Sequence, residues 1–236
     1  LKQSNIQRPY IAFTSTEKEP GKLVLSAEGL TKSYDGQLVF KGFDLEVYRG
    51  EKIGVIGNNG RGKTTLLKML ASVVEPDEGK VSLGHLAHLS YFPQNHADLL
   101  DKSEKISNFD WLRRSKHGVY DQDIRGALGR VLFSGDDAFK QIQSLSGGET
   151  ARLLLAKMML EDHNVLILDE PNNHLDLEAV SALTEGLKSY KGAVIVASHD
   201  QDLIGGVAEK LIVFEETGPV MYRGTLQDYL KTRAQA

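Results

Sequence analysis

The apolar positions along this 236-residue chain alternate between short unbroken runs and segments of helical spacing. Runs of four or five mostly apolar residues favour buried strands, and they lie at 53–56, 165–168 and 193–197. Helical spacing is found at about 149–160 and 178–190. This alternation predicts an α/β fold with a mostly parallel sheet, helices on both faces and ligands at the carboxyl ends of the strands.

The amino-terminal part of the chain predicts shorter strands in an antiparallel arrangement. A strand opens at Leu23, a turn is expected at 34–36, and alternating apolar positions from 38 to 47 favour a bent or bulged strand. The remaining expected strands lie at 81–83, 89–92, 210–214 and 220–222. The first of these segments predict an antiparallel β subdomain beside the parallel sheet.

Residues 103–133 change character, because apolar side chains recur there at helical spacing. Trp111, the only tryptophan, is expected to pack in the core of this small helical lobe rather than stack on a ligand. We expect the lobe to occupy about 95–145, inserted in one domain that spans 21–236. Residues 1–20 are polar and contain two prolines, so they predict an extended tail.

Composition and charge exclude several classes of function. The net charge of −4 gives no bulk attraction to nucleic acid or anionic lipid, so any such contact must be local. Cysteine is absent, which excludes disulfides, thiolate catalysis and cysteine-ligated zinc. No apolar run is long enough for a bilayer span and no segment resembles a signal peptide, which favours a soluble cytoplasmic protein. Because the chain begins at Leu1 rather than Met, we expect it to be part of a longer one.

The strongest chemical signal directly follows the first unbroken apolar run. The residues there are Gly57, Asn58, Asn59, Gly60, Arg61, Gly62, Lys63, Thr64 and Thr65. They fit the G-x-x-x-x-G-K-[ST] pattern, whose fixed positions occur by chance in about one per cent of chains of this length. Its glycines let backbone N–H groups surround a phosphate chain at a helix N-terminus. We therefore predict nucleotide binding, with Lys63 on the β- and γ-phosphates and Thr64 on Mg²⁺; a glycine turn without a ligand is the alternative.

Two adjacent carboxylates end the second unbroken apolar run. Asp169 is expected to hold the Mg²⁺ shell, and Glu170 to take or orient the proton of the attacking water. Acidic residues in an ordinary strand-to-loop turn would look the same in isolation. The phosphate loop upstream favours the catalytic interpretation.

A second glycine pair precedes one of the predicted helices. Ser146 is placed to cap that helix, which leaves the backbone amides of Gly147 and Gly148 as a second anion site. A simple helix cap is the alternative. The presence of Gln94 after one strand and His199 after another favours the anion site, because all these features occur together in one chain.

In their order along the chain, the motifs resemble those of the ATP-binding-cassette (ABC) family, and the resemblance extends from residue 23 to about 230. The resemblance implies an ABC-type P-loop domain that binds ATP and Mg²⁺ and hydrolyses ATP. It implies that Tyr34 stacks on adenine and that His199 hydrogen-bonds the γ-phosphate. It also implies that Gln94 senses Mg²⁺ and the attacking water, beside the metal contacts expected of Thr64 and Asp169.

The same resemblance implies that each ATP site is completed by an opposing cassette. Ser146, Gly147 and Gly148 would contact the γ-phosphate of ATP held by that partner, and Asp176 would link the two sites. The partner cassette would belong to the same full-length chain, or be a second copy of this fragment. An isolated copy is then expected to bind ATP and turn it over slowly.

One segment resembles the ABC-F branch of the family in particular. It reads Glu170-Pro171-Asn172-Asn173-His174-Leu175-Asp176, with Asn172 in place of the usual threonine. Segments 9–13, 128–133 and 222–230 resemble the end of the inter-cassette linker, the short helical lobe and the closing segment of a C-terminal ABC-F cassette. The tail at 1–20 would then be the end of that linker. ABC-F proteins lack membrane domains and act on ribosomes, so the resemblance implies ribosomal RNA or protein as a partner.

Three other functions stay open at the level of sequence. The motor subunit of an ABC membrane transporter would use the same chemistry with a different partner. A chromosome- or repair-type ATPase is disfavoured, because only about eighty residues separate Lys63 from Ser146. A scaffold that merely binds nucleotide is disfavoured by Glu170, since binding alone needs no general base.

Several remaining polar residues have simpler interpretations. Six histidines show no metal-ligand spacing and are expected at surface or loop positions: His85, His88, His96, His117, His163 and His174. Arg61 is expected to point to solvent. The basic residues Arg113, Arg114 and Lys116 favour a solvated helix face over an RNA contact.

Overall fold

The computed structural model describes residues 8–16, 19–116 and 118–234, and these form two compact units. The sheet unit comprises Ser15–Gln94, Asp162–Pro171 and Tyr190–Ala236, and the helical unit comprises Asn95–Glu161, Asn172–Ser189 and the described residues before 15. Parts of the predicted tail, 1–7 and 17–18, lie outside the described residues, as does His117.

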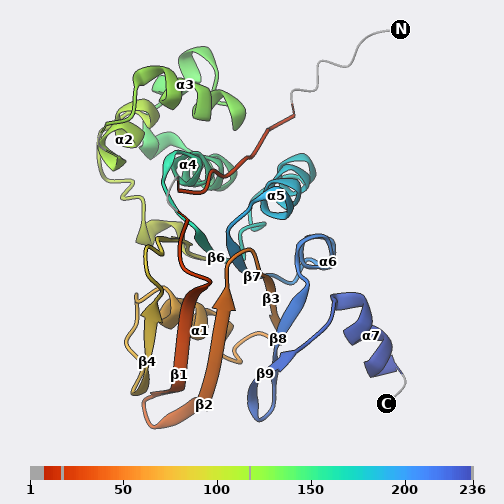
Figure 1. Cartoon of the computed structure of the whole chain (residues 1–236). Coiled ribbons are helices and arrows are strands. Elements are labelled where there is room, and N and C mark those ends of the chain that lie inside the picture. The colour runs from red at the N-terminus through yellow and green to blue at the C-terminus, as the bar shows by residue number, and fades with distance from the viewer. Residues whose placement is uncertain (1–7, 17–18, 117, 235–236) are drawn as a thin grey trace, which may run out of the picture. The chain divides into compact units, whose positions relative to one another are not determined.

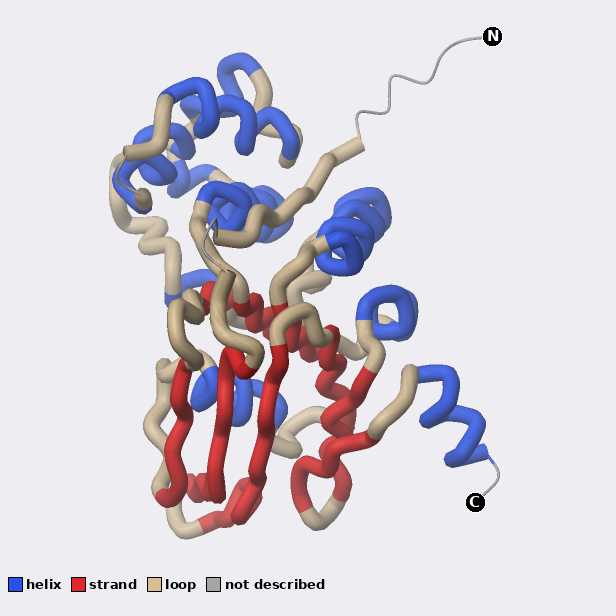
Figure 2. Tube along the Cα trace, viewed as in Figure 1, coloured by secondary structure: helices blue, strands red, loops and turns tan. Residues whose placement is uncertain are grey.

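A six-stranded sheet forms the centre of the sheet unit (Figure 2). Its order is β5 (Leu89–Phe92), β6 (Val165–Asp169), β7 (Ala193–Ala197), β3 (Lys52–Gly57), β8 (Lys210–Glu215) and β9 (Gly218–Tyr222). All neighbouring strands are parallel except β8 and β9. Every residue of β6 and β7 is buried, as unbroken apolar runs require. The predicted mostly parallel sheet is confirmed.

A second, antiparallel sheet in the same unit has the order β2 (Gln37–Tyr48), β1 (Leu23–Tyr34) and β4 (Glu78–Leu83) (Figure 1). The pairing of β1 with β2 shifts register at several points, which confirms the predicted bend. Phe40 of β2 makes edge contacts with Phe43 at 6.4 Å and with Phe214 of β8 at 6.0 Å between ring centroids. The two sheets therefore share one hydrophobic core.

Three helices complete the sheet unit, and the sequence pattern did not predict two of them. Helix α1 (Lys63–Leu70) begins at the phosphate loop, as predicted, whereas α6 (Gln201–Val207) and α7 (Leu226–Ala234) were not expected. Helix α6 is short and contains two glycines, which weaken its helical signal. Its first turn is instead fixed by Asp200, whose side chain accepts hydrogen bonds from the backbone of two following residues. Helix α7 buries little besides Leu226, so it shows no apolar periodicity.

The helical unit is built from four α-helices, and Figure 1 shows α2 and α3 next to α4. They are α2 (Asn108–Ser115), α3 (Asp121–Arg130), α4 (Gly147–Leu160) and α5 (Leu177–Ser189), with 3₁₀ turns η1 (His96–Asp98), η2 (Gly135–Phe139) and η3 (Ile142–Ser144). Trp111 is 4% exposed, which confirms its predicted place in the core. The Arg113 and Arg114 guanidinium groups lie on the surface, paired with Asp121 at 3.3 Å and Glu104 at 2.7 Å.

One of the histidines expected at surface or loop positions lies in a loop and is nevertheless buried. His163 is buried, with its Nδ1 3.0 Å from the hydroxyl of Tyr190, while its carbonyl oxygen accepts a hydrogen bond from that hydroxyl at 2.9 Å. The expected loop position is confirmed, and the side chain is covered because this loop leads into the buried strand β6. The hydrogen bonds satisfy the polar atoms that burial would otherwise leave unpaired.

Lys52 adds a buried charge to the same region. Its Nζ donates to the carbonyl oxygens of Tyr190 and Gly192, both at 2.6 Å, and lies 5.1 Å from the centroid of the Tyr190 ring. Burial lowers the pKa of Lys52 to about 8, with the charge of Glu209 opposing that shift. The pKa in the folded protein is thus below its usual value of 10.5.

We expect the Lys52→Met variant to lose a pH dependence of stability that the wild type has. Between pH 8 and 10.5 the unfolded wild type binds more protons than the folded one, so its free energy of unfolding rises with pH. The rise relative to Lys52→Met is up to about 1.4 kcal/mol per pH unit. Urea unfolding of both proteins at pH 7, 8, 9 and 10 measures it. Parallel curves for the two proteins would contradict the expected shift.

Candidate functional site

The phosphate loop connects β3 to α1 in a conformation that requires glycine at its end. Gly62 is the N-cap of α1 and has a φ of 105°. A Cβ placed on it would lie 2.4 Å from Cγ1 of Val39, so any larger residue would displace the Val39 side chain. The loop therefore closes tightly on β2, with the positive end of the α1 dipole at its centre.

The side chain of Lys63 is folded back into the loop. Its Nζ donates to the carbonyl oxygens of Gly57 at 2.8 Å and Asn58 at 3.2 Å, and lies 3.2 Å from Nε2 of His199. Burial lowers the pKa of Lys63, while the charges of Glu170 and Asp169 oppose the change. The carbonyl oxygens that hold this cation are neutral, and charged phosphate oxygens make stronger hydrogen bonds to it.

Asp169 and Glu170 end β6 next to that ammonium group. Both carboxylate oxygens of Asp169 are buried and accept no hydrogen bond of standard geometry from the described residues. Burial raises the pKa of Asp169, and the Thr64 hydroxyl and Lys63 counteract part of the rise. Buried carboxylate oxygens next to hydroxyl and amide oxygens suit a hard cation such as Mg²⁺. The Thr64 hydroxyl lies 3.4 Å from Oε1 of Gln94, which brings all three predicted metal contacts to one edge of the sheet.

Glu170 is positioned by the backbone as much as by its neighbours. Its φ of 47° is unusual for a residue with a side chain and marks local strain. Its N–H donates to the carbonyl of Ala197 at 2.8 Å, while its Oε2 accepts from the N–H of His199 at 3.3 Å. Its Oε1 lies 3.4 Å from Nε2 of His199. The last residue of β7 thus holds the backbone of Glu170, and His199 in the loop after β7 contacts its carboxylate.

A cavity of about 360 Å³ collects most of the predicted nucleotide residues. Its lining comprises Tyr34, Val39, Asn59, Gly60, Gly62, Lys63, Thr64, Thr65, Gln94, Asp169 and Glu170. Tyr34 is 46% exposed, which leaves its ring available for stacking. Val39 was missed from the sequence, because nothing in an alternating strand shows which apolar residue touches the phosphate loop.

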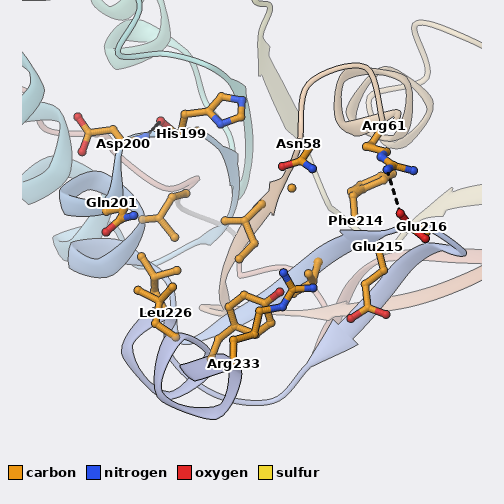
Figure 3. Close-up of a pocket in the computed structure, with 17 residues that line it drawn as sticks. Asn58, Arg61, His199, Asp200, Gln201, Phe214, Glu215, Glu216, Leu226 and Arg233 are labelled. Atoms are coloured by element: carbon orange, nitrogen blue, oxygen red, sulfur yellow. Dashed lines mark hydrogen bonds and ion pairs between the residues drawn. The ribbon is translucent and has the colours of Figure 1, made fainter. Parts of the chain in front are cut away.

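Three predicted residues, Asn58, Arg61 and His199, line a neighbouring cavity of about 530 Å³ between the phosphate loop, α6 and α7 (Figure 3). Arg61 was expected to point to solvent. Its side chain is 40% exposed, and its guanidinium lies 3.7 Å from the carboxylate of Glu216, as the dashed line in Figure 3 shows. Such an exposed ion pair contributes little stability.

Ser146, Gly147 and Gly148 belong to the helical unit and begin α4. The Ser146 hydroxyl accepts from the N–H of Glu149 at 3.2 Å, and the Glu149 carboxylate accepts from the N–H of Ser146 at 2.8 Å. This capping box confirms the predicted cap. Lys140 lies 2.7 Å from the same carboxylate, and its hydrogen bond lowers the pKa of Glu149. The loop is thereby fixed at its third helical residue.

A phosphate loop, a carboxylate pair at the end of a buried strand and a capped glycine pair define the ATPase domain of an ABC protein. The chain matches the ABC transporter family over residues 40–173 and belongs to that family. Within the part of the chain that the structure describes, no helix is long and apolar enough to cross a membrane.

Several curated proteins are similar to nearly the whole chain. It is 37% identical to "Probable ATP-binding protein YbiT" of Escherichia coli O157:H7 over 99% of this chain and 44% of that protein. It is 39% identical to "Uncharacterized ABC transporter ATP-binding protein YkpA" of Bacillus subtilis (strain 168), over 98% of this chain and 43% of that protein. "ABC transporter F family member 5" of Arabidopsis thaliana is 35% identical over 92% of this chain and 31% of its own length. These relatives confirm the predicted resemblance to ABC-F proteins, and the chain spans less than half the length of each.

Solved structures show the same fold. The structure of a bacterial Atm1-family ABC exporter with ATP bound has a TM-score of 0.77 and 17% identity, covering 96% of this chain and 45% of that one. A putative metal-chelate type ABC transporter in an inward-facing conformation has a TM-score of 0.70 and 23% identity, covering 88% and 85%. At these identities the comparison supports the fold alone.

Proposed function

We propose that this chain is one cassette of a two-cassette ABC-F protein, its C-terminal one, and that the whole protein is a ribosome-associated translation factor. The observation that supports this most is the 37% identity to a YbiT protein over 99% of the chain. The ABC-F version of the segment from Glu170 to Asp176 supports the same assignment. The compartment that fits this role is the cytoplasm.

The proposed reaction is hydrolysis of ATP at the cavity below Tyr34, whose ring would stack on adenine. Lys63 would leave its carbonyl partners for the β- and γ-phosphates, and His199 would hydrogen-bond the γ-phosphate. Glu170 would take the proton of the attacking water at a carboxylate oxygen. Thr64, Asp169 and Gln94 would hold Mg²⁺, which when bound neutralises charge on the phosphates.

The proposed site is completed by a second cassette. Ser146, Gly147 and Gly148 of the partner would donate to the γ-phosphate from their hydroxyl and amide groups. A single copy of this chain then has all the groups that bind ATP but lacks part of those that stabilise the transition state. Its turnover should rise with protein concentration, as two copies meet.

The ribosome role is tested with the full-length protein carrying Glu170→Gln. We expect it to sediment with ribosomes in ATP and to remain in the supernatant in ADP, with Glu185→Gln, an exposed carboxylate of α5, as the control. The variant should slow release because hydrolysis is the step that opens the pair. Co-purification with a membrane permease instead of ribosomes would select a transporter motor. Sedimentation equal in both nucleotides would contradict an ATP-dependent role.

A further inference from the structure

His174 occupies an unusual backbone conformation in the loop that leads into α5. Its φ is 69°, in the left-handed region that residues with side chains seldom adopt. The conformation costs free energy unless neighbouring groups hold it, and it commonly marks a functional site. The residue is exposed, so burial of its ring does not explain the conformation.

The left-handed turn places His174 directly against the glycine pair that begins α4. A Cβ on Gly148 would lie 2.5 Å from the carbonyl oxygen of His174, which is shorter than any real contact of that kind. A Cβ on Gly147 would lie 3.1 Å from Cγ and 3.2 Å from Nδ1 of the His174 ring. The ring and the carbonyl of His174 therefore form a surface on which both glycines lie, and only glycine allows this approach.

A second, weaker contact joins the same two segments one turn further on. The carboxylate of Asp176 lies 3.7 Å from the guanidinium of Arg152 in α4 and also accepts a hydrogen bond at 2.8 Å from the N–H of Ala179. The His174 ring itself is met edge-on by His96, with 6.0 Å between ring centroids. All these residues belong to the helical unit, so the glycine pair and the loop before α5 form one packed assembly.

We propose that His174 is a positioning residue, which holds the Ser146–Gly148 loop in the conformation that receives a partner cassette's nucleotide. The inference rests on the proposed pairing of cassettes. The backbone of His174 acts through the glycines and touches no phosphate. Its left-handed turn sets where the amides of Gly147 and Gly148 point, and its ring limits their motion. The Ser-Gly-Gly sequence then requires its glycines because the His174 of Asn-His-Leu-Asp lies against them, although the two sequences lie far apart along the chain.

Hydrogen exchange in the nucleotide-free chain tests the positioning directly. We expect His174→Ala to speed amide exchange of Glu149 and Thr150, whose N–H groups donate to Ser146, about tenfold, because alanine disfavours the left-handed turn. His174→Asn should retain most of the protection, since asparagine tolerates that conformation. Gly148→Ala should speed exchange both at Glu149 and Thr150 and at 172–176, because its Cβ must displace the His174 carbonyl. Gly129→Ala, at an open position of α3, is the matched control and should change neither segment.

ATP-dependent pairing of two cassettes gives a second measurement, which a change in local stability alone would not alter. In the Glu170→Gln background, ATP-dependent pairing of His174→Ala should be weakened about tenfold, with ATP affinity of the single chain unchanged, and His174→Asn should restore most of the pairing. Exchange within twofold of wild type in His174→Ala, or undiminished pairing, would overturn the inference. If Glu170→Gln itself does not pair in ATP, the proposed pairing fails, while the exchange experiment still decides the role of His174.

Discussion

Glu170→Gln is expected to lower ATP hydrolysis at least about a hundredfold, the usual size of a general-base contribution. Glutamine has the same shape and can still accept the hydrogen bond that the N–H of His199 donates to Oε2. It cannot take a proton from water, so the chemical step is lost while the site remains intact. The affinity for ATP should stay within about threefold, because no net attraction to phosphate is removed. The variant should therefore accumulate in a closed, ATP-bound pair.

Single-turnover hydrolysis at saturating ATP measures the chemical step, and titration with ATP measures binding. Glu185→Gln makes the same chemical change on the exposed surface of α5 and should leave both quantities at the wild-type level. Hydrolysis that falls less than fivefold would remove Glu170 from the role of base. A loss of ATP binding would show that the carboxylate stabilises the loop, and would contradict the proposed role equally.

The meeting of the proposed catalytic residues could be predicted because strand order and motif position coincide. The neighbouring parallel strands β6, β7 and β3 end at the same edge of the sheet. Glu170, His199 and the phosphate loop each lie at the carboxyl end of one of these strands. Unbroken apolar runs identified the strands, and the polar residue after each run identified the site. The local sequence pattern and the strand topology therefore both place the site at the carboxyl ends of these strands.

Contacts that depend on distant packing could not be predicted in this way. Val39 touches the phosphate loop only because β2 folds back over Gly62. His163 contacts Tyr190, which lies 27 residues further along the chain. His174 lies directly against Gly147 and Gly148, and neither the Ser-Gly-Gly motif nor the segment around His174 shows from its own pattern why glycine is needed there. Each case needs the three-dimensional arrangement, since a period of two or 3.6 residues describes only neighbours along the chain.

Substitution of Lys63 by methionine should weaken ATP binding by about tenfold to a hundredfold, the effect of losing a hydrogen bond between charged groups. The ammonium is the one group of the loop that brings a full positive charge to the cavity, next to the acidic Asp169 and Glu170. Without it those two carboxylates would repel the γ-phosphate. Methionine has nearly the same length and no charge, so the packing of α1 is preserved. The loss should appear in ATP affinity rather than in folding.

Titration with ATP, ADP and AMP locates the effect along the phosphate chain. Because Lys63 is proposed to contact the β- and γ-phosphates, its removal should weaken ATP binding most, ADP less, and AMP hardly at all. Lys188→Met, at the exposed end of α5, is the matched control and should bind all three nucleotides as the wild type does. Equal weakening of all three would mean that the loop had collapsed. Unchanged ATP affinity would mean that the dipole of α1 and the backbone amides of the loop suffice, and that the ammonium only neutralises its acidic neighbours.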